Sequence, residues 1–269
     1  MLRFSGAGRT DVGLVRADNE DSGFVGPTLL MVADGVGGNA AGEIASATTV
    51  YVVSAAALSR VGLRPSGVLT NAVAASQRQV AQGTHQSPEL AGMATTLTAL
   101  LTDGQRFALA HLGDSRCYVI REGRLTRVTS DHTWVQRMQD EGRMTEAEAS
   151  IHPWRNVVMR TVNGDPASGA DIVSLALRPG DRVLLASDGL TDLVSDAWIE
   201  QILTSHPDDA AVDLLVDAAL SAGGRDNITC VLATVIEGPA ISADGLLLGA
   251  VCNPSNIIDA AAVRAHASA

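Results

Sequence analysis

Two short apolar runs each end at an Asp-Gly pair, and this pattern limits the fold more than any other feature of the chain. Residues 29–33 run directly into Asp34-Gly35, and residues 182–186 run through one serine into Asp188-Gly189. An apolar run of about five residues that stops at a turn signal is typical of a buried strand. Strands that end in carboxylates place acidic groups together where neighbouring strands of a sheet meet one edge.

The remaining segments predict paired strands followed by paired helices. Glu122-Gly123 separates two of the expected strands and predicts a hairpin. This order favours a layered α+β domain over a doubly wound parallel sheet. We expect helices over residues 40–58, 67–82, 135–141, 145–150, 197–203 and 210–219, and further strands over 95–101, 107–112, 116–120, 125–129 and 228–235.

The charge balance and the cysteines limit the function classes. A net charge of −11 argues against nucleic acid as a partner, since nucleic acids bind basic surfaces. No apolar stretch reaches the roughly 18 residues of a membrane helix, and the start lacks the apolar core of a signal peptide. The three cysteines show no metal-binding spacing, which is typical of unpaired thiols in a reducing cytoplasm.

Five short motifs carry most of the acidic residues that could do chemistry. Any one Asp-Gly pair is most simply a turn former. Together they are harder to explain as turns, because converging buried carboxylates repel one another unless cations lie between them. Oxygen donors suit magnesium or manganese, whereas zinc favours His or Cys. The motifs are Asn19-Glu20-Asp21, Asp34-Gly35-Val36-Gly37-Gly38, Gly113-Asp114-Ser115-Arg116, Ser187-Asp188-Gly189 and Gly224-Arg225-Asp226-Asn227.

With Arg16 and Asp192 added, the order of these motifs resembles the metal-dependent Ser/Thr protein phosphatases of type 2C, and most closely their bacterial branch. The similarity spans about residues 10 to 235. It implies a four-layer α/β/β/α sandwich with two central antiparallel sheets and a flap subdomain at about residues 131–165. Residues 1–237 would form the catalytic domain. Residues 238–269 would be a C-terminal extension that could pack on the domain, mediate self-association or be disordered.

The resemblance also implies an activity and a site. The enzyme would hydrolyse phosphoserine and phosphothreonine in proteins by attack of a metal-activated water, as a cytoplasmic monomer opposing bacterial Ser/Thr kinases. Its cofactors would be two Mn²⁺ or Mg²⁺ ions, with a possible third. Position by position, Asp34 would bridge two ions, Asp188 and Asp226 would complete one ion's ligands, and the Gly35 carbonyl would serve the other; Glu20 and Asp21 would hold metal-bound waters, Asp114, Asp188 and Asp192 a third ion, and Arg16 the phosphate.

Several features leave alternatives open. Val36 stands where animal members carry a histidine proposed as general acid, and Asn39 where many bacterial members carry another. A metal-bound water would then protonate the leaving oxygen, while His111 and His132 are expected to pack rather than catalyse. The alternatives are a non-catalytic phosphoprotein-binding pseudophosphatase, a phosphatase for an anti-anti-sigma factor, and a metal-dependent nuclease. The complete aspartate set favours the kinase-opposing enzyme.

Overall fold

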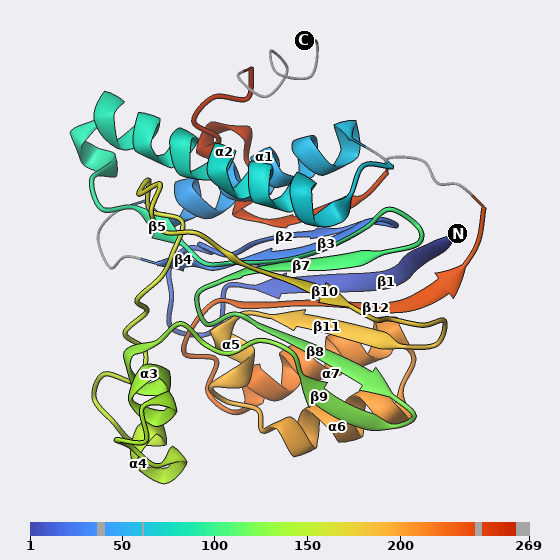
Figure 1. The fold of residues 1–269 in the computed structure, drawn as a ribbon. Coiled ribbons are helices and arrows are strands. Elements are labelled where there is room, and N and C mark those ends of the chain that lie inside the picture. Colours follow the sequence, from blue (N-terminus) through green and yellow to red (C-terminus); the bar gives the residue numbers. More distant parts are fainter. Residues whose placement is uncertain (37–40, 61, 240–243, 262–269) are drawn as a thin grey trace.

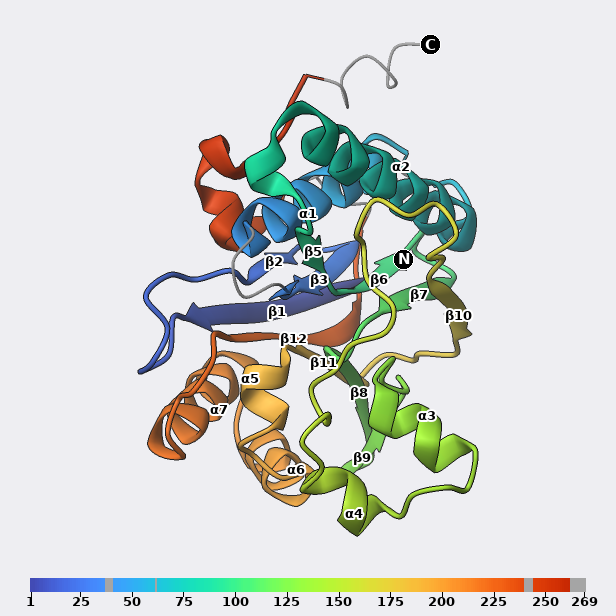
Figure 2. The ribbon, with the colours of Figure 1, turned by 90° about the vertical axis from the view of Figure 1, so that its left-hand side faces the viewer.

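The computed structural model describes residues 1–36, 41–60, 62–239 and 244–261. Two antiparallel sheets pack face to face at the centre, and helices cover the outer face of each sheet (Figures 1 and 2). This is the predicted α/β/β/α sandwich. The side-by-side order of the strands differs from their order along the chain, so residues distant in sequence meet in both sheets.

The first sheet has five strands in the order β1-β12-β11-β8-β9. The first strand was not predicted, and it pairs with the last strand of this sheet over ten residues, from Leu2↔Glu237 to Asp11↔Ile228. The two ends of the domain therefore lie side by side. The strands are β1 (Leu2–Asp11), β8 (Arg116–Arg121), β9 (Arg124–Arg127), β11 (Arg182–Ala186) and β12 (Ile228–Glu237).

The second sheet has six strands in the order β10-β7-β6-β3-β2-β13. The predicted run 29–33 is its strand β3 and is buried throughout. Neighbouring strands cover both of its edges, and the other sheet and a helix cover its two faces. The strands are β2 (Ser22–Val25), β3 (Leu29–Ala33), β6 (Leu97–Thr102), β7 (Phe107–Leu112), β10 (Asp171–Leu175) and β13 (Leu246–Gly249); β4 (Gly35–Val36) and β5 (Ala94–Thr95) form a separate pair.

Three apolar clusters hold the layers together. One fills the space between the sheets, with Leu30, Leu109 and Leu185 among its members. The second lies between the six-stranded sheet and helices α1 (Gly42–Ser59) and α2 (Pro65–Gln86). The third lies between the five-stranded sheet and helices α5 (Asp188–Thr191), α6 (Asp196–Ser205) and α7 (Asp208–Ser221). Burial of these faces is the main force that holds the sandwich together.

The flap region projects from one end of the sandwich and carries α3 (Trp134–Asp140) and α4 (Glu146–Ser150) (Figure 2). Side chains of threonines cap the N-termini of both helices. The Trp134 ring stacks on His152 at 4.9 Å and meets Trp154 edge-on at 5.0 Å. This aromatic cluster serves as a small core, although Trp154 remains 54% exposed.

Part of the predicted C-terminal extension packs on the domain. Strand β13 adds to the edge of the six-stranded sheet by pairing with β2. Two short 3-10 helices follow, η2 (Ala250–Cys252) and η3 (Pro254–Asn256). No helix in the described residues has both the length and the apolar character needed to cross a bilayer.

Candidate metal centre

Asp34 follows β3 and has a firmly fixed backbone. Its N–H donates to Thr96 Oγ1 at 2.9 Å. Its carbonyl oxygen accepts from the Thr96 N–H at 2.8 Å and from Thr95 Oγ1 at 2.8 Å. Gly35 pairs with Thr95 directly after it. The sequence places the aspartate at the strand end, and threonines of the neighbouring strand hold it there.

Asp188 begins α5, and its carboxyl lies next to that of Asp34. Burial is the main cause that holds the pKa of both carboxyls well above its ordinary value, and nearby aspartates add to it. Oδ1 of Asp188 is buried and has no hydrogen-bond partner among the described residues. Two carboxyls in contact can share one proton, but two charges there need a counter-ion.

Asp21 is fully buried just before β2. Its Oδ2 accepts from Ser187 Oγ at 2.8 Å, whereas its Oδ1 has no hydrogen-bond partner in the part of the chain that the structure describes. Burial raises the pKa of Asp21 to about 7. The neighbouring Glu20 is only partly buried, and its pKa is also raised, first by burial and then by Glu43. Both carboxylates therefore lie where a cation or its waters would stabilise their charged form.

Arg16 and Asp226 are brought together by opposite ends of the chain. Arg16 lies in the loop after β1, and Asp226 lies just before β12. The Arg16 Nη2 atom is 2.7 Å from Asp226 Oδ2, and the side chains are 46% and 35% exposed. An ion pair this exposed is screened by water, so either partner can exchange it for a ligand at low cost.

Asp114 and Asp192 lie on the flap side of the site. Asp114 occupies the turn between β7 and β8, and burial, followed by the charge of Asp131, raises its pKa to about 7. Asp192 follows α5 and is exposed. Its Oδ2 accepts from Asn156 Nδ2 of the flap region at 3.2 Å. One candidate ligand of a third ion, Asp192, is thus in direct contact with the flap.

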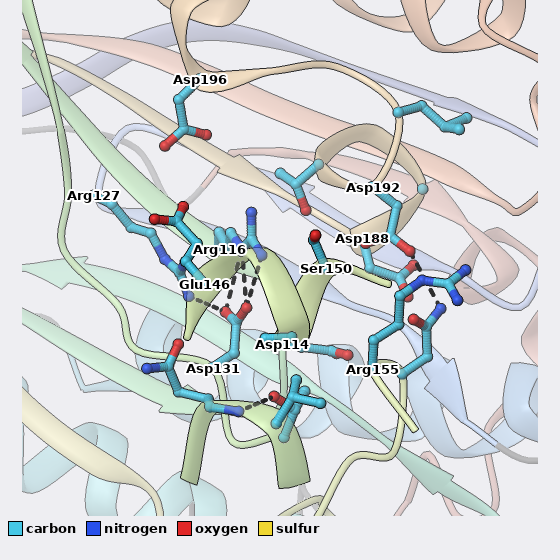
Figure 3. Close-up of a pocket in the computed structure, with 18 of the residues that line it drawn as sticks. Asp114, Arg116, Arg127, Asp131, Glu146, Ser150, Arg155, Asp188, Asp192 and Asp196 are labelled. Carbon is cyan, nitrogen blue, oxygen red and sulfur yellow. Dashed lines mark hydrogen bonds and ion pairs between the residues drawn. The ribbon is translucent and has the colours of Figure 1, made fainter. Parts of the chain in front are cut away.

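A pocket of about 690 Å³ opens beside these carboxylates, between the flap region and the start of α6 (Figure 3). Asp114, Asp188 and Asp226 line it together with residues of α3 and α4. The size and position suit a phosphorylated side chain that approaches the aspartates from solvent.

The donor set fits hard divalent cations. All of the candidate side-chain ligands are carboxylates, which Mn²⁺ and Mg²⁺ accept. Two buried carboxylate oxygens have no hydrogen-bond partner within residues 1–36, 41–60, 62–239 and 244–261. Among the described residues, no three His, Cys, Asp or Glu side chains already have the arrangement that holds an ion. Asp34 contacts Asp188, and Asp226 contacts Arg16, so an ion would replace both contacts.

The two nearby histidines have packing roles. His111 is buried, and burial followed by His132 lowers its pKa to about 4, so it is neutral near pH 7. His132 accepts from the Gly113 N–H through Nδ1 at 3.1 Å, and its Nε2 lies 3.0 Å from Asp171 Oδ2. Val36 is partly buried in β4. Gly37, Gly38 and Asn39 lie outside the described residues.

Sequence reasoning gave no role to three residues that support the site. Ser187 bonds Asp21, and Asn156 bonds Asp192. Asn227 accepts from the Glu20 N–H at 2.8 Å and donates to the Val12 and Asp18 carbonyls. Ser187 and Asn227 belong to two of the five acidic motifs, and each stands next to a candidate ligand. This adjacency is the sequence signal that could have indicated a supporting role for them.

Known proteins share this architecture. A family model described as "Protein phosphatase 2C" matches residues 5–221. Serine/threonine protein phosphatase PstP of Mycobacterium tuberculosis is 42% identical over 251 residues, which are 93% of this chain and 48% of PstP. Serine/threonine phosphatase stp of Listeria welshimeri is 32% identical over 83% of this chain and 93% of that protein. This chain thus spans about half the length of the mycobacterial relative.

Solved structures agree with the sequence matches. The catalytic domain of PstP in complex with two manganese ions aligns with a TM-score of 0.82 at 41% identity, covering 88% of this chain and all of that one. A Mycobacterium smegmatis PPM Ser-Thr phosphatase aligns with a TM-score of 0.76 at 34% identity, covering 87% and 98%. Since the family model matches most of the sequence and these structures share the two-sheet sandwich, the chain belongs to the protein phosphatase 2C family.

Proposed function

We propose that this chain is a protein serine/threonine phosphatase that uses two Mn²⁺ or Mg²⁺ ions, with a possible third. The observation that carries the proposal is the meeting of Asp34 and Asp188, whose pKa values are held high by burial and by neighbouring aspartates. The named relatives, which are serine/threonine phosphatases, support the same reading.

Each group has a separate task in the proposed mechanism. Asp34, Asp188 and Asp226 bind the two main ions with the Gly35 carbonyl, and Asp114 and Asp192 with Asp188 bind the third. When bound, a pair of such ions lowers the pKa of water and offsets charge on the phosphoryl group. Glu20 and Asp21 orient water. The Arg16 guanidinium leaves Asp226 and binds two phosphate oxygens as a fork.

The proposed substrates are phosphoproteins made by Ser/Thr kinases. We also propose that the enzyme acts as a monomer, because residues of one chain supply the whole set of candidate ligands. The free thiols of Cys117, Cys230 and Cys252 support a reducing compartment, and we propose the cytoplasm.

The test is hydrolysis of a phosphothreonine peptide with Mn²⁺, with Mg²⁺ and with a chelator. Activity with either ion that the chelator removes is the expected result. The Asp34→Asn variant, measured in parallel, controls for a contaminating phosphatase. If a sample that binds Mn²⁺ by calorimetry hydrolyses the peptide in none of these conditions, the result would contradict the proposal and favour a pseudophosphatase.

A further inference from the structure

Residues 246–260, here called the C-terminal strap, lie outside the part of the chain that the family model matches. The strap begins as β13, continues through the two 3-10 helices, and crosses α1 toward α2 (Figure 1). It occupies the edge of the six-stranded sheet next to β2, and β2 begins one residue after Asp21.

The strap is anchored to β2 by strand pairing and by an apolar side chain. The pairing runs from Leu246↔Val25 to Gly249↔Ser22. Leu248 is 9% exposed and joins the apolar cluster between the two sheets. A strand that is paired on both sides is held more firmly than one at an open edge.

Where β13 ends, the strap contacts the backbone of the Glu20–Ser22 segment. The Ala250 N–H donates to the Asp21 carbonyl oxygen at 2.8 Å. Gly249 has φ +74°, and a Cβ at this position would collide with the same carbonyl oxygen. Glycine therefore permits the close approach of the two segments.

A chain of hydrogen bonds leads from the strap to Glu20. The Val251 N–H donates to Ser22 Oγ at 3.1 Å, and Ser22 Oγ lies 3.0 Å from Ser46 Oγ in α1. Ser46 Oγ donates to the Glu20 carbonyl oxygen at 2.5 Å. Each hydroxyl accepts one bond and donates the next, so the bonds strengthen one another.

The far end of the strap is fixed to the helices. The Ile258 N–H donates to Thr48 Oγ1 at 3.2 Å, and Tyr51 Oη donates to the Ala260 carbonyl at 3.0 Å. Both partners belong to α1, which also carries Ser46. The strap and α1 thus enclose the Glu20–Ser22 segment from two directions.

We propose that the C-terminal strap is a positioning element that fixes Glu20 and Asp21 for binding of the divalent ions. The inference rests on the proposed function in one respect, namely that these two carboxylates hold metal-bound water. The groups that orient metal ligands typically change metal affinity about 10- to 100-fold when they are lost. The strap acts on them through their backbone.

The first test is Gly249→Ala in the full chain, with calorimetric titration of Mn²⁺ and hydrogen exchange of the Ala250 and Val251 amides. The added methyl group pushes the strap from Asp21, so we expect faster exchange and about 10-fold weaker Mn²⁺ binding. Gly123→Ala is the matched control, because Gly123 has φ +78° but open space around it. It should show the same backbone strain and normal Mn²⁺ affinity.

The second test is Ser46→Ala, which breaks the bond to Glu20 without touching the strap. We expect weaker Mn²⁺ binding with normal exchange at Ala250, whose amide bonds the Asp21 carbonyl directly. Ser54→Ala is its control, since Ser54 is also buried in α1 but bonds only Val50 of its own helix.

The outcomes separate the proposal from a merely structural role. A lower melting temperature with unchanged Mn²⁺ affinity in both test variants would overturn it, and so would unchanged exchange and affinity in Gly249→Ala. A full chain that binds Mn²⁺ without hydrolysing phosphopeptide would contradict the proposed function alone. The calorimetric comparison would then still decide the role of the strap.

Discussion

At the scale of single residues, the proposed chemistry of the centre depends on Asp34 and Asp188, which lie side by side. Asp34→Asn, Asp188→Asn and Asp226→Asn each remove one charged donor and keep the shape of the side chain. We expect each to lower kcat/KM on a phosphothreonine peptide by more than about 100-fold, since groups that only orient metal ligands already cost 10- to 100-fold. Circular dichroism should show an intact fold.

The control for these variants is Asp103→Asn, in the turn between β6 and β7. Asp103 bonds Arg106 and lies in none of the five motifs or the pocket. It should retain full activity. If any of the three ligand variants is as active as Asp103→Asn, that residue does not belong to the assigned site.

Arg16 offers a test of phosphate binding that is separate from metal binding. Arg16→Ala removes the fork but no metal ligand, so KM for the phosphopeptide should rise by about 10-fold or more while kcat changes less. Arg16→Lys keeps the charge without the forked donor geometry, so its KM should lie between those of the unchanged protein and Arg16→Ala. Steady-state kinetics at saturating Mn²⁺ measure both. An unchanged KM in Arg16→Ala would contradict the assigned role.

The sequence was sufficient to locate the acidic residues, but it did not reveal how they are supported. The Asp-Gly pairs mark strand ends, and for this reason Asp34 and Asp188 could be placed at one edge of the sandwich. Ser187 contacts Asp21, which lies 166 positions earlier. No local pattern reports a contact over such a distance. The pairing of Arg16 with Asp226 escaped prediction for the same reason.

At the scale of elements, one buried glutamine of α2 ties down the base of the flap. Its side chain makes four hydrogen bonds to backbone groups and is 3% exposed. Gln77 Nε2 donates to the Thr161 and Ser168 carbonyls, and Gln77 Oε1 accepts from the Asn163 and Gly164 N–H groups.

Gln77→Leu keeps the approximate size of the side chain and leaves these buried groups without partners. We expect a loss of about 1–3 kcal/mol in the free energy of unfolding. Exchange of the Asn163 and Gly164 amides should become faster. Gln86→Leu on the exposed face of the same helix is the control and should change neither. Urea denaturation and hydrogen exchange provide the two measurements.

The elements that the sequence missed depend on their partners. Runs such as 29–33 are apolar enough to be recognised alone, and the structure confirms them. Strand β1 contains Gly6 and Gly8 and has no continuous apolar run, yet it pairs with β12 over its whole length. A Cβ at Gly6 would collide with the Leu232 carbonyl, so closeness to β12 selects glycine there. Strand β10 lies at a sheet edge and is largely exposed, which hides its apolar pattern.

At the scale of the whole molecule, the raised carboxyl pKa values couple stability to pH and to metal. As pH rises from about 6.5 to 8, the folded metal-free protein releases the protons that it holds on Asp21 and Asp114, whose pKa values are about 7. The unfolded chain, with aspartate pKa values of about 3.9, does not hold them. The free energy of unfolding must therefore fall as pH rises through this window.

We expect the melting temperature with a chelator to drop by about 5 °C or more from pH 6.5 to 8, and Mn²⁺ to restore it at pH 8. His111 opposes this trend in part, because it stays neutral in the folded protein while the unfolded chain still binds a proton near pH 6.5, but this one group is outweighed by the carboxyls. Scanning calorimetry at both pH values measures the effect. A metal-free protein that is more stable at pH 8 would contradict it.

The fold class could be read from the sequence because the apolar strands and helices follow the order of a layered domain. The position of β13 could not, since its partner β2 lies more than 200 residues earlier. The sequence of residues 238–269 is compatible with either a packed or a free segment, because the strand that β13 covers, β2, lies elsewhere in the chain.

The pairing of β1 with β12 has a consequence for folding during synthesis. During translation the first eleven residues emerge long before residues 228–237 exist, so the five-stranded sheet cannot close until nearly the whole domain has left the ribosome. Asp226, a candidate metal ligand, joins the site at the same late stage. A growing chain therefore completes its candidate metal centre only after residue 226 has emerged, and a product truncated before that residue lacks Asp226.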